Sequence, residues 1–156
     1  MPEFYRPDSY QRGESLGWLL KRVQQSIAQQ AGLRLAKDGL THAQWVPLLI
    51  LRLGGPSPVA SLARELETDT GAMTRLLDRL EAKGLCLRER SSEDRRVVMV
   101  SLTEEGMTLT SKLTAVLADV FNAHLQGFSE AEWRLLLSLL QRLIANGDAL
   151  RQAEQG

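Results

Sequence analysis

The sequence contains few of the residues on which disulfide, metal and redox chemistry depend. Cys86 is the only cysteine among 156 residues, so no internal disulfide can form. The two histidines, His42 and His124, and the single cysteine have no close spacing that suits a metal site. The chain also lacks a glycine-rich phosphate loop and a Gly-x-Ser-x-Gly nucleophile elbow. These absences predict that the protein is not an enzyme and that it holds no metal or cofactor.

Long apolar runs are missing as well. The longest strongly apolar stretch, Val46 to Leu53, is interrupted by Pro47 and Arg52 and is too short to span a membrane. No basic leader followed by an apolar run opens the chain, and a single cysteine suits a reducing compartment, so we expect a cytoplasmic protein with no membrane partner. Apolar residues make up 44% of the chain and aromatic residues 5%, a composition typical of a globular protein with a buried core.

The charges balance, but they are unevenly distributed. Nineteen lysines and arginines match nineteen aspartates and glutamates, which argues against indiscriminate binding to nucleic acids or acidic membranes. Residues 74–96 hold seven basic and five acidic residues, a local charge of +2, whereas residues 119–156 hold three and five, a local charge of −2. The cations therefore lie where a groove-binding surface would need them.

Apolar periodicity predicts six helices and one hairpin. The first helix runs from Ser15 to about Lys37 and has one apolar face. The second opens at Thr41, which forms a capping box with Gln44, and ends near residues 54–56.

Two shorter helices follow. The third begins with Ser57 as its N-cap and Pro58 at its first position, where no amide hydrogen is needed, and ends near Leu66. Asp69 is placed to cap a fourth helix, which ends at Gly84. The apolar face of this fourth helix comprises Met73, Leu76, Leu77 and Leu80. Its opposite face comprises Gly71, Arg75 and Asp78, flanked by Thr74 and Arg79.

A hairpin and two long helices complete the pattern. Strands are predicted at residues 85–90 and 97–102, joined by a polar turn at residues 91–94. A fifth helix follows Thr103 and runs to about Phe128. A capping box of Ser129 and Glu132 opens the sixth helix.

The order helix, turn, helix, strand, charged tip, strand is that of a winged helix-turn-helix. The predicted fold class is therefore mainly α with a small β-hairpin wing (α+β). We expect one domain over residues 1–156, in which a DNA-binding lobe at residues 41–102 is flanked by dimerisation helices at residues 10–38 and 103–156.

The fourth helix carries side chains that suit contact with DNA. An α-helix fits the major groove, arginine can donate two hydrogen bonds to guanine, and threonine can meet a thymine methyl group or a phosphate. The candidate DNA-binding residues on this helix are Thr70, Gly71, Thr74, Arg75 and Arg79. An ordinary solvated helix face would carry the same residue types, so the helix alone leaves both interpretations open.

The hairpin tip favours the DNA interpretation. Guanidinium groups there can reach flanking phosphates or enter a narrow minor groove, where the potential is negative. The candidate DNA-binding residues of the wing are Arg90, Ser92, Asp94, Arg95 and Arg96. The alternative is a solvated turn in which Glu93 and Asp94 merely neutralise the arginines.

Several motifs resemble those of the MarR family of bacterial transcription regulators, and the resemblance spans nearly the whole chain. The matching motifs are Leu16-Gly17, Leu40-Thr41-x-x-Gln44-Trp45, Leu62-Ala63, Thr74-Arg75-x-x-Asp78-Arg79-Leu80-Glu81-x-Lys83-Gly84, Asp94-Arg95-Arg96 and Val100-x-Leu102-Thr103-x-x-Gly106. The resemblance implies a sequence-specific regulator, most commonly a repressor, whose homodimer places two winged modules on a pseudo-palindromic double-stranded operator. It also implies that Asp94 orients Arg96.

The leucine stripes support a dimer independently of the resemblance. The first and last helices are amphipathic, and a winged-helix core of about 60 residues cannot cover both apolar faces. A partner chain can cover them. The alternative is that these helices pack on each other within one chain.

The resemblance further implies a small-molecule inducer, often a phenolic or aromatic carboxylate, bound where the dimerisation helices meet the DNA-binding lobe. The candidate ligand-binding residues are Trp18, Arg22, His42 and Trp45. An indole can stack on the ring of such a ligand and a guanidinium can pair with its carboxylate. Trp45 can equally be a core residue, His42 a polar first-turn residue and Arg22 a solvated one.

Two further alternatives concern the thiol and the class of partner. Some members of the resembling family use a cysteine as an oxidation switch, but Cys86 lies beside leucines, and such a cysteine is more often a small buried apolar residue.

A winged helix can also bind another protein instead of DNA, and a DNA-binding regulator can lose its response to an inducer. Salt-dependent binding to duplex DNA would distinguish DNA recognition from protein contact.

Overall fold

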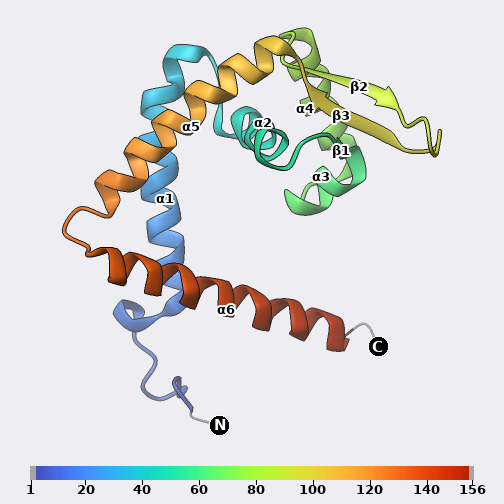
Figure 1. Ribbon diagram of the computed structural model, residues 1–156. Coiled ribbons are helices and arrows are strands. Elements are labelled where there is room, and N and C mark those ends of the chain that lie inside the picture. Colours follow the sequence, from blue (N-terminus) through green and yellow to red (C-terminus); the bar gives the residue numbers. More distant parts are fainter. Residues whose placement is uncertain (1–2, 155–156) are drawn as a thin grey trace. The chain divides into compact units, whose positions relative to one another are not determined.

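The computed structural model describes residues 3–154, and most of them are helical (Figure 1). The elements in chain order are η1 (Arg12–Glu14), α1 (Leu16–Leu35), η2 (Ala36–Asp38), α2 (His42–Gly54), β1 (Ser57–Pro58), α3 (Val59–Glu65), α4 (Thr70–Ala82), β2 (Cys86–Arg90), β3 (Val98–Leu102), α5 (Glu104–His124) and α6 (Glu130–Glu154). The chain divides into two compact units after Val120, within α5. The predicted fold class, mainly α with a β-hairpin wing, is confirmed.

Polar side chains cap several of the helices, at Ser15 as well as at the predicted positions Thr41 and Ser129. The Ser15 hydroxyl accepts from the Trp18 amide at 3.3 Å at the start of α1, and Thr41 and Gln44 form the expected capping box of α2. In the second unit, the Ser129 amide donates to the Glu132 carboxylate at 2.8 Å and opens α6. These short polar side chains satisfy amide groups that have no partner inside the helix.

The prediction that Ser57 and Pro58 open a helix is wrong. They form the short strand β1, in which Ser57 pairs with Val100 and Pro58 with Met99 of β3, and the sheet order is β1-β3-β2, all antiparallel. The Ser57 hydroxyl donates to the carbonyl of Gly55 at 3.2 Å and caps no helix. Proline is tolerated in β1 because the strand lies at the edge of the sheet and needs no amide hydrogen on its open side.

Two predicted helix ends also differ. α1 ends at Leu35 and continues only as the 3₁₀ turn η2. α5 ends at His124 instead of Phe128, because residues 125–127 form a turn in which Gly127 adopts a φ of +88°. Phe128 continues the apolar spacing of α5 beyond this turn, so the prediction from periodicity alone placed the end of the helix too late in the chain.

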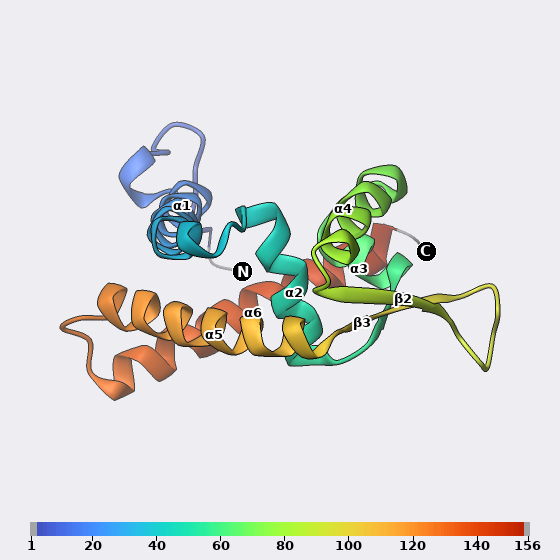
Figure 2. The ribbon, with the colours of Figure 1, turned by 90° about the horizontal axis from the view of Figure 1, so that it is seen from above.

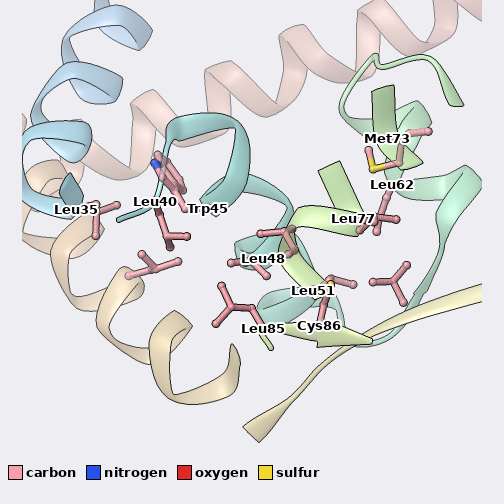
Figure 3. Packing of buried hydrophobic residues seen from close by; sticks show 14 of the residues in the cluster. Leu35, Leu40, Trp45, Leu48, Leu51, Leu62, Met73, Leu77, Leu85 and Cys86 are labelled. Atoms are coloured by element: carbon pink, nitrogen blue, oxygen red, sulfur yellow. The ribbon is translucent and has the colours of Figure 1, made fainter. Parts of the chain in front are cut away.

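The hydrophobic core lies within the first unit, between the C-terminal end of α1, α2, α3, α4, the hairpin and α5 (Figure 3). Leu35, Leu48, Leu77 and Leu113 have no exposed surface. Burying a leucine side chain contributes about 1.5–3 kcal/mol to stability. This core therefore holds α4 and the hairpin in one lobe, from which the hairpin projects (Figure 2).

The base of the hairpin contacts the first turn of α5 closely. The Thr103 hydroxyl donates to the carbonyl of Gly84 at 2.5 Å and accepts from the Gly106 amide at 3.0 Å. A Cβ atom added to Gly106 would lie 2.0 Å from the carbonyl oxygen of Leu85. Only glycine therefore allows helix and hairpin to approach this closely.

We expect Gly106→Ala to lower the free energy of unfolding by at least about 1–3 kcal/mol, because the added methyl group must push α5 away from the hairpin. Urea unfolding followed by circular dichroism measures the change. Gly32→Ala is the matched control, since a Cβ there meets nothing within 4 Å, and it should be neutral or stabilise α1 by up to about 1 kcal/mol. Equal stability of the two variants would contradict the close packing at Gly106.

Candidate nucleic-acid interface

One face of α4 is fully buried and the opposite face is exposed. Met73, Leu77 and Leu80 have 0% exposed surface. The Asp69 carboxylate accepts from the Ala72 amide at 2.9 Å and caps the helix, and this hydrogen bond lowers the pKa of Asp69. The cap and the apolar contacts together fix both the start of α4 and its rotation about its own axis.

The predicted DNA-binding residues of α4 all lie on its exposed side. They are Thr70, Gly71, Thr74, Arg75 and Arg79. Thr74 is exposed, and its hydroxyl donates to the Thr70 carbonyl at 2.8 Å, which leaves its oxygen free to act as an acceptor. The Arg75 guanidinium lies over Gly71, because a Cβ added there would be 3.5 Å from its Nη1 atom. The face therefore offers guanidinium donors and small residues without disturbing the core.

A left-handed residue shapes the turn that precedes α4. Glu67 has a φ of +48°, which is unusual for a residue other than glycine. The Thr68 amide donates to the Ala63 carbonyl at 2.9 Å across this turn. The turn thus brings α4 onto α3 in the helix-turn-helix arrangement.

The tip of the hairpin is an ordered loop. The Ser91 amide donates to the Val97 carbonyl at 2.8 Å, and the Val97 amide donates to the Asp94 carbonyl at 2.9 Å. Arg90, predicted to contact DNA, donates from Nη1 to the Arg95 carbonyl at 2.8 Å. Ser92, at the end of the loop, is exposed. One donor of Arg90 therefore closes the tip.

Asp94 holds Arg96 at the tip. Its carboxylate accepts from the Arg96 amide at 3.0 Å, from Nε at 3.2 Å and from Nη2 at 3.3 Å. The hydrogen bonds from Arg96 lower the pKa of Asp94. The side chain of Arg96 is nevertheless 92% exposed, and Arg95 is exposed beside it. Two guanidinium groups therefore point into solvent at the tip, and one of them is oriented by a carboxylate.

From the sequence, no contact was assigned to two basic residues that the structure connects to other elements. Arg88 of β2 binds the carboxylates of Asp78 and Glu81 on α4. Lys83 donates from Nζ to the Gly39 carbonyl at 2.9 Å and to Gln44 Oε1 at 3.3 Å, which joins the end of α4 to the corner before α2. The paired acids Asp78 and Glu81, three residues apart on one helix, were a signal for a basic partner.

The four predicted ligand-binding residues fall into separate local arrangements. The rings of His42 and Trp45 on α2 meet edge to face, with centroids 4.9 Å apart. Trp18 on α1 is covered by the Arg12 guanidinium at 4.7 Å. Arg22 is exposed. Among residues 3–154, no aromatic ring contact joins Trp18 to the pair on α2.

Trp45 is a core residue with an unusual polar atom. It is only 5% exposed, and its indole Nε1 has no hydrogen-bond partner within the described part of the chain. A buried donor without a partner costs about 1–3 kcal/mol. The core interpretation of Trp45 therefore holds, yet its N–H group is left available to an acceptor.

Cys86 is buried at the start of β2. Burial raises the pKa of its thiol to about 11, so the thiol stays protonated near neutral pH. The interpretation of Cys86 as a small buried apolar residue agrees with this environment.

Two features are absent from the described part of the chain. No helix within residues 3–154 combines the length and the apolar character that crossing a bilayer requires. The same described residues contain no group of three or more His, Cys, Asp and Glu side chains arranged to hold a metal ion.

Comparisons with known proteins agree with this architecture. Residues 40–98 match the profile of the MarR family. The chain is 30% identical over 142 residues to the HTH-type transcriptional regulator SarZ of Staphylococcus haemolyticus, which covers 91% of this chain and 95% of the relative.

Solved structures are similar as well. A mutant of E. coli MarR complexed with operator DNA superposes with a TM-score of 0.71 at 29% identity, covering 82% of this chain and 92% of that one. Bordetella bronchiseptica BpsR, solved in a study of how 6-hydroxynicotinic acid regulates its DNA binding, has a TM-score of 0.72 at 26% identity and covers 86% and 96%. With a matching winged lobe and relatives of matching length, the chain belongs to the MarR family of DNA-binding transcriptional regulators.

Proposed function

We propose that this regulator is a cytoplasmic repressor that binds a pseudo-palindromic operator as a homodimer and leaves it when a small aromatic or phenolic carboxylate binds. The observation that carries the proposal is the one-sided burial of α4, which exposes Arg75 and Arg79 on the same lobe as the arginines of the wing.

In the proposed complex, α4 lies in the major groove. Arg75 and Arg79 donate to guanine edges, and the threonines of the exposed face contact thymine methyl groups or phosphates. The wing lies beside a flanking minor groove, where Arg95 and Arg96 meet its negative potential. The solved complex of the similar E. coli MarR with operator DNA supports this proposal.

The dimer proposal is supported by apolar faces that the chain leaves uncovered. None of the described residues of α6 is buried, although this helix is rich in leucine. Its exposed large apolar residues are Trp133, Leu135, Leu136, Leu137, Leu139, Leu143, Ile144 and Leu150. The first half of α1 is exposed in the same way at Leu16, Leu19, Leu20 and Val23. Apolar faces of this extent mark an interface, and a second copy of the chain would cover them.

The ligand proposal is supported by chemistry at the start of α2. The Trp45 N–H group has no acceptor among residues 3–154, and the His42 ring stands against the same indole. The similar BpsR is regulated by 6-hydroxynicotinic acid, an aromatic carboxylic acid. A ligand lowers DNA affinity only if it binds the conformation that the operator disfavours. We therefore propose that an aromatic acid engages Trp18, Arg22, His42 and Trp45 in that conformation.

We expect substitutions of Arg75 and Arg96 to weaken DNA binding in different ways. Arg75→Ala should cost about 1–3 kcal/mol of operator affinity and relax the base preference, because a two-donor contact to one base is removed. Arg96→Ala should weaken binding to many sequences alike, because a wing arginine reads groove shape or phosphate. Fluorescence anisotropy with an operator selected from a random duplex library, and with its single-base variants, separates the two effects.

Lys112→Ala, on the exposed side of α5 outside the proposed interface, is the matched control and should leave affinity and base preference unchanged. Unaltered operator affinity in both arginine variants would show that α4 and the wing are assigned wrongly.

If an aromatic acid is the inducer, we expect aromatic acids to weaken the complex of this protein with DNA. Salicylate, benzoate and 6-hydroxynicotinate, titrated onto the operator complex, should include an acid that raises the Kd for DNA by about 5–150-fold. Arg22→Gln should retain DNA affinity and lose this response, because the carboxylate loses its cation. The matched control is Lys21→Gln on the same helix. A DNA complex unaffected by all three acids, or an Arg22→Gln variant that responds like the wild type, would contradict the proposed effector site.

A further inference from the structure

Arg88 joins the wing to the recognition helix through a compact cluster of charges. Its Nη2 atom lies 2.5 Å from Asp78 Oδ1 and 2.5 Å from Glu81 Oε2, and its Nε atom lies 3.1 Å from Glu81 Oε2. The backbone amide of Arg88 also donates to Glu81 Oε1 at 2.9 Å. Glu81 thus accepts from both the main chain and the side chain of one residue of β2.

The pair of Arg88 with Glu81 is better shielded than an ordinary surface ion pair. The Arg88 side chain is 23% exposed and that of Glu81 is 32% exposed, whereas that of Asp78 is 56% exposed. Hydrogen bonds from Arg88 lower the pKa of Glu81, and those from Glu81 and Asp78 raise the pKa of Arg88. A planar guanidinium that binds a carboxylate through two donors also fixes direction, which a single exposed pair does not.

The contacts of Arg88 continue toward the tip of the wing. Side chains two residues apart on a strand lie on the same face, so Arg90 follows Arg88 along the face of β2 that meets α4. Arg90 binds the Arg95 carbonyl, and Arg95 precedes Arg96. Two groups of hydrogen bonds, one between β2 and α4 at Arg88 and one within the wing at Arg90, are therefore joined by the short stretch of β2 between these residues.

The outer part of the wing needs such support. β1 pairs with β3 only at Met99 and Val100. From the pairing of Arg90 with Val98 outward, the hairpin has two strands, and an isolated two-stranded hairpin is marginally stable. The Arg88 cluster lies next to the point where support from the third strand ends.

Besides supporting the wing, the cluster changes the charge of the face of α4 that is proposed to meet DNA, because it includes Asp78. Asp78 lies on the exposed side of α4, on the same face as Arg75. A free carboxylate there would repel DNA phosphates, and the Arg88 guanidinium, which it shares with Glu81, offsets part of this negative charge.

We propose that Arg88 is a positioning residue for DNA recognition, which clamps the wing to α4 so that Arg75 and Arg96 engage one operator together. The proposal rests on the DNA contacts proposed above. Arg88 acts through the wing, so its removal should abolish most of the contribution that Arg96 makes.

A double-mutant cycle tests this dependence. Operator affinity is measured for the wild type, Arg88→Gln, Arg96→Ala and the double variant, at a temperature where circular dichroism shows every protein folded. We expect Arg88→Gln to weaken binding about ten-fold and the double variant to bind nearly as well as the weaker single variant, because coupled residues are not additive. Arg88→Lys, which keeps the charge but lacks the two-donor geometry, should fall between Arg88→Gln and the wild type.

Hydroxyl-radical footprinting of the Arg88→Gln complex supplies a readout that a loss of stability alone does not change. Protection of the flanking minor grooves should disappear, while protection of the sites of α4 remains. Adding Asp78→Asn and Glu81→Gln to Arg88→Gln removes the unbalanced carboxylates, and the flanking protection should still be missing. Its return in this triple variant would show that Arg88 acts only by charge and would overturn the positioning role.

Two results distinguish failure of this inference from failure of the proposed function. If Arg96→Ala weakens binding but the Arg88→Gln effect is absent or simply adds to it, the positioning role is wrong and the DNA contacts stand. If Arg96→Ala has no effect in the wild-type background, the assignment of the wing itself is wrong, and the inference fails with it.

Discussion

The burial of one face of α4 is the constraint on which the rest of the DNA-binding lobe depends. Met73, Leu77 and Leu80 are completely excluded from solvent, and truncating a side chain of this kind to alanine typically costs about 2–5 kcal/mol. No rotation of α4 keeps these contacts and also buries Arg75. Core packing therefore decides which face of the helix is available to a groove, before any contact with DNA is made.

The wing is held at two places, against α5 and against α4, with different chemistry. At its base, Gly106 lets α5 approach the carbonyl of Leu85, and Thr103 connects both segments by hydrogen bonds. Further out, Arg88 binds two carboxylates of α4. The first contact is steric and the second electrostatic, and together they join α4, the hairpin and the start of α5.

Local sequence signals predicted the parts of the structure that local interactions determine. The caps at Thr41 and Asp69 and the buried face of α4 were foreseen because side chains close in sequence make them. The strand at Ser57 and Pro58 was missed because its partners lie some forty residues away in β3, and a Ser-Pro pair looks the same before a helix as at a sheet edge. Local signals cannot specify such long-range pairing.

In the candidate site too, local features could be predicted from the sequence and contacts between distant segments could not. The exposed residues of α4 and the acid at Asp94 beside Arg96 follow from helical spacing and from a family motif. The contacts of Arg88 could not be predicted in this way, because its carboxylate partners belong to another element and become neighbours only in the folded lobe. The proposed effector residues are the least constrained by sequence, since an edge contact such as that of His42 with Trp45 serves a core or a ligand equally well.

The central claim is that two copies of this lobe read one operator, each through α4 and its wing. Chemical footprinting of the wild-type protein on its selected operator tests it most directly. The account predicts guanine contacts in two major-groove segments about one helical turn, 10–10.5 base pairs, apart or a multiple of that spacing, related by two-fold symmetry and each flanked by minor-groove protection on one face of the duplex. A single protected segment, or protection confined to the phosphates with no guanine contact, would contradict it.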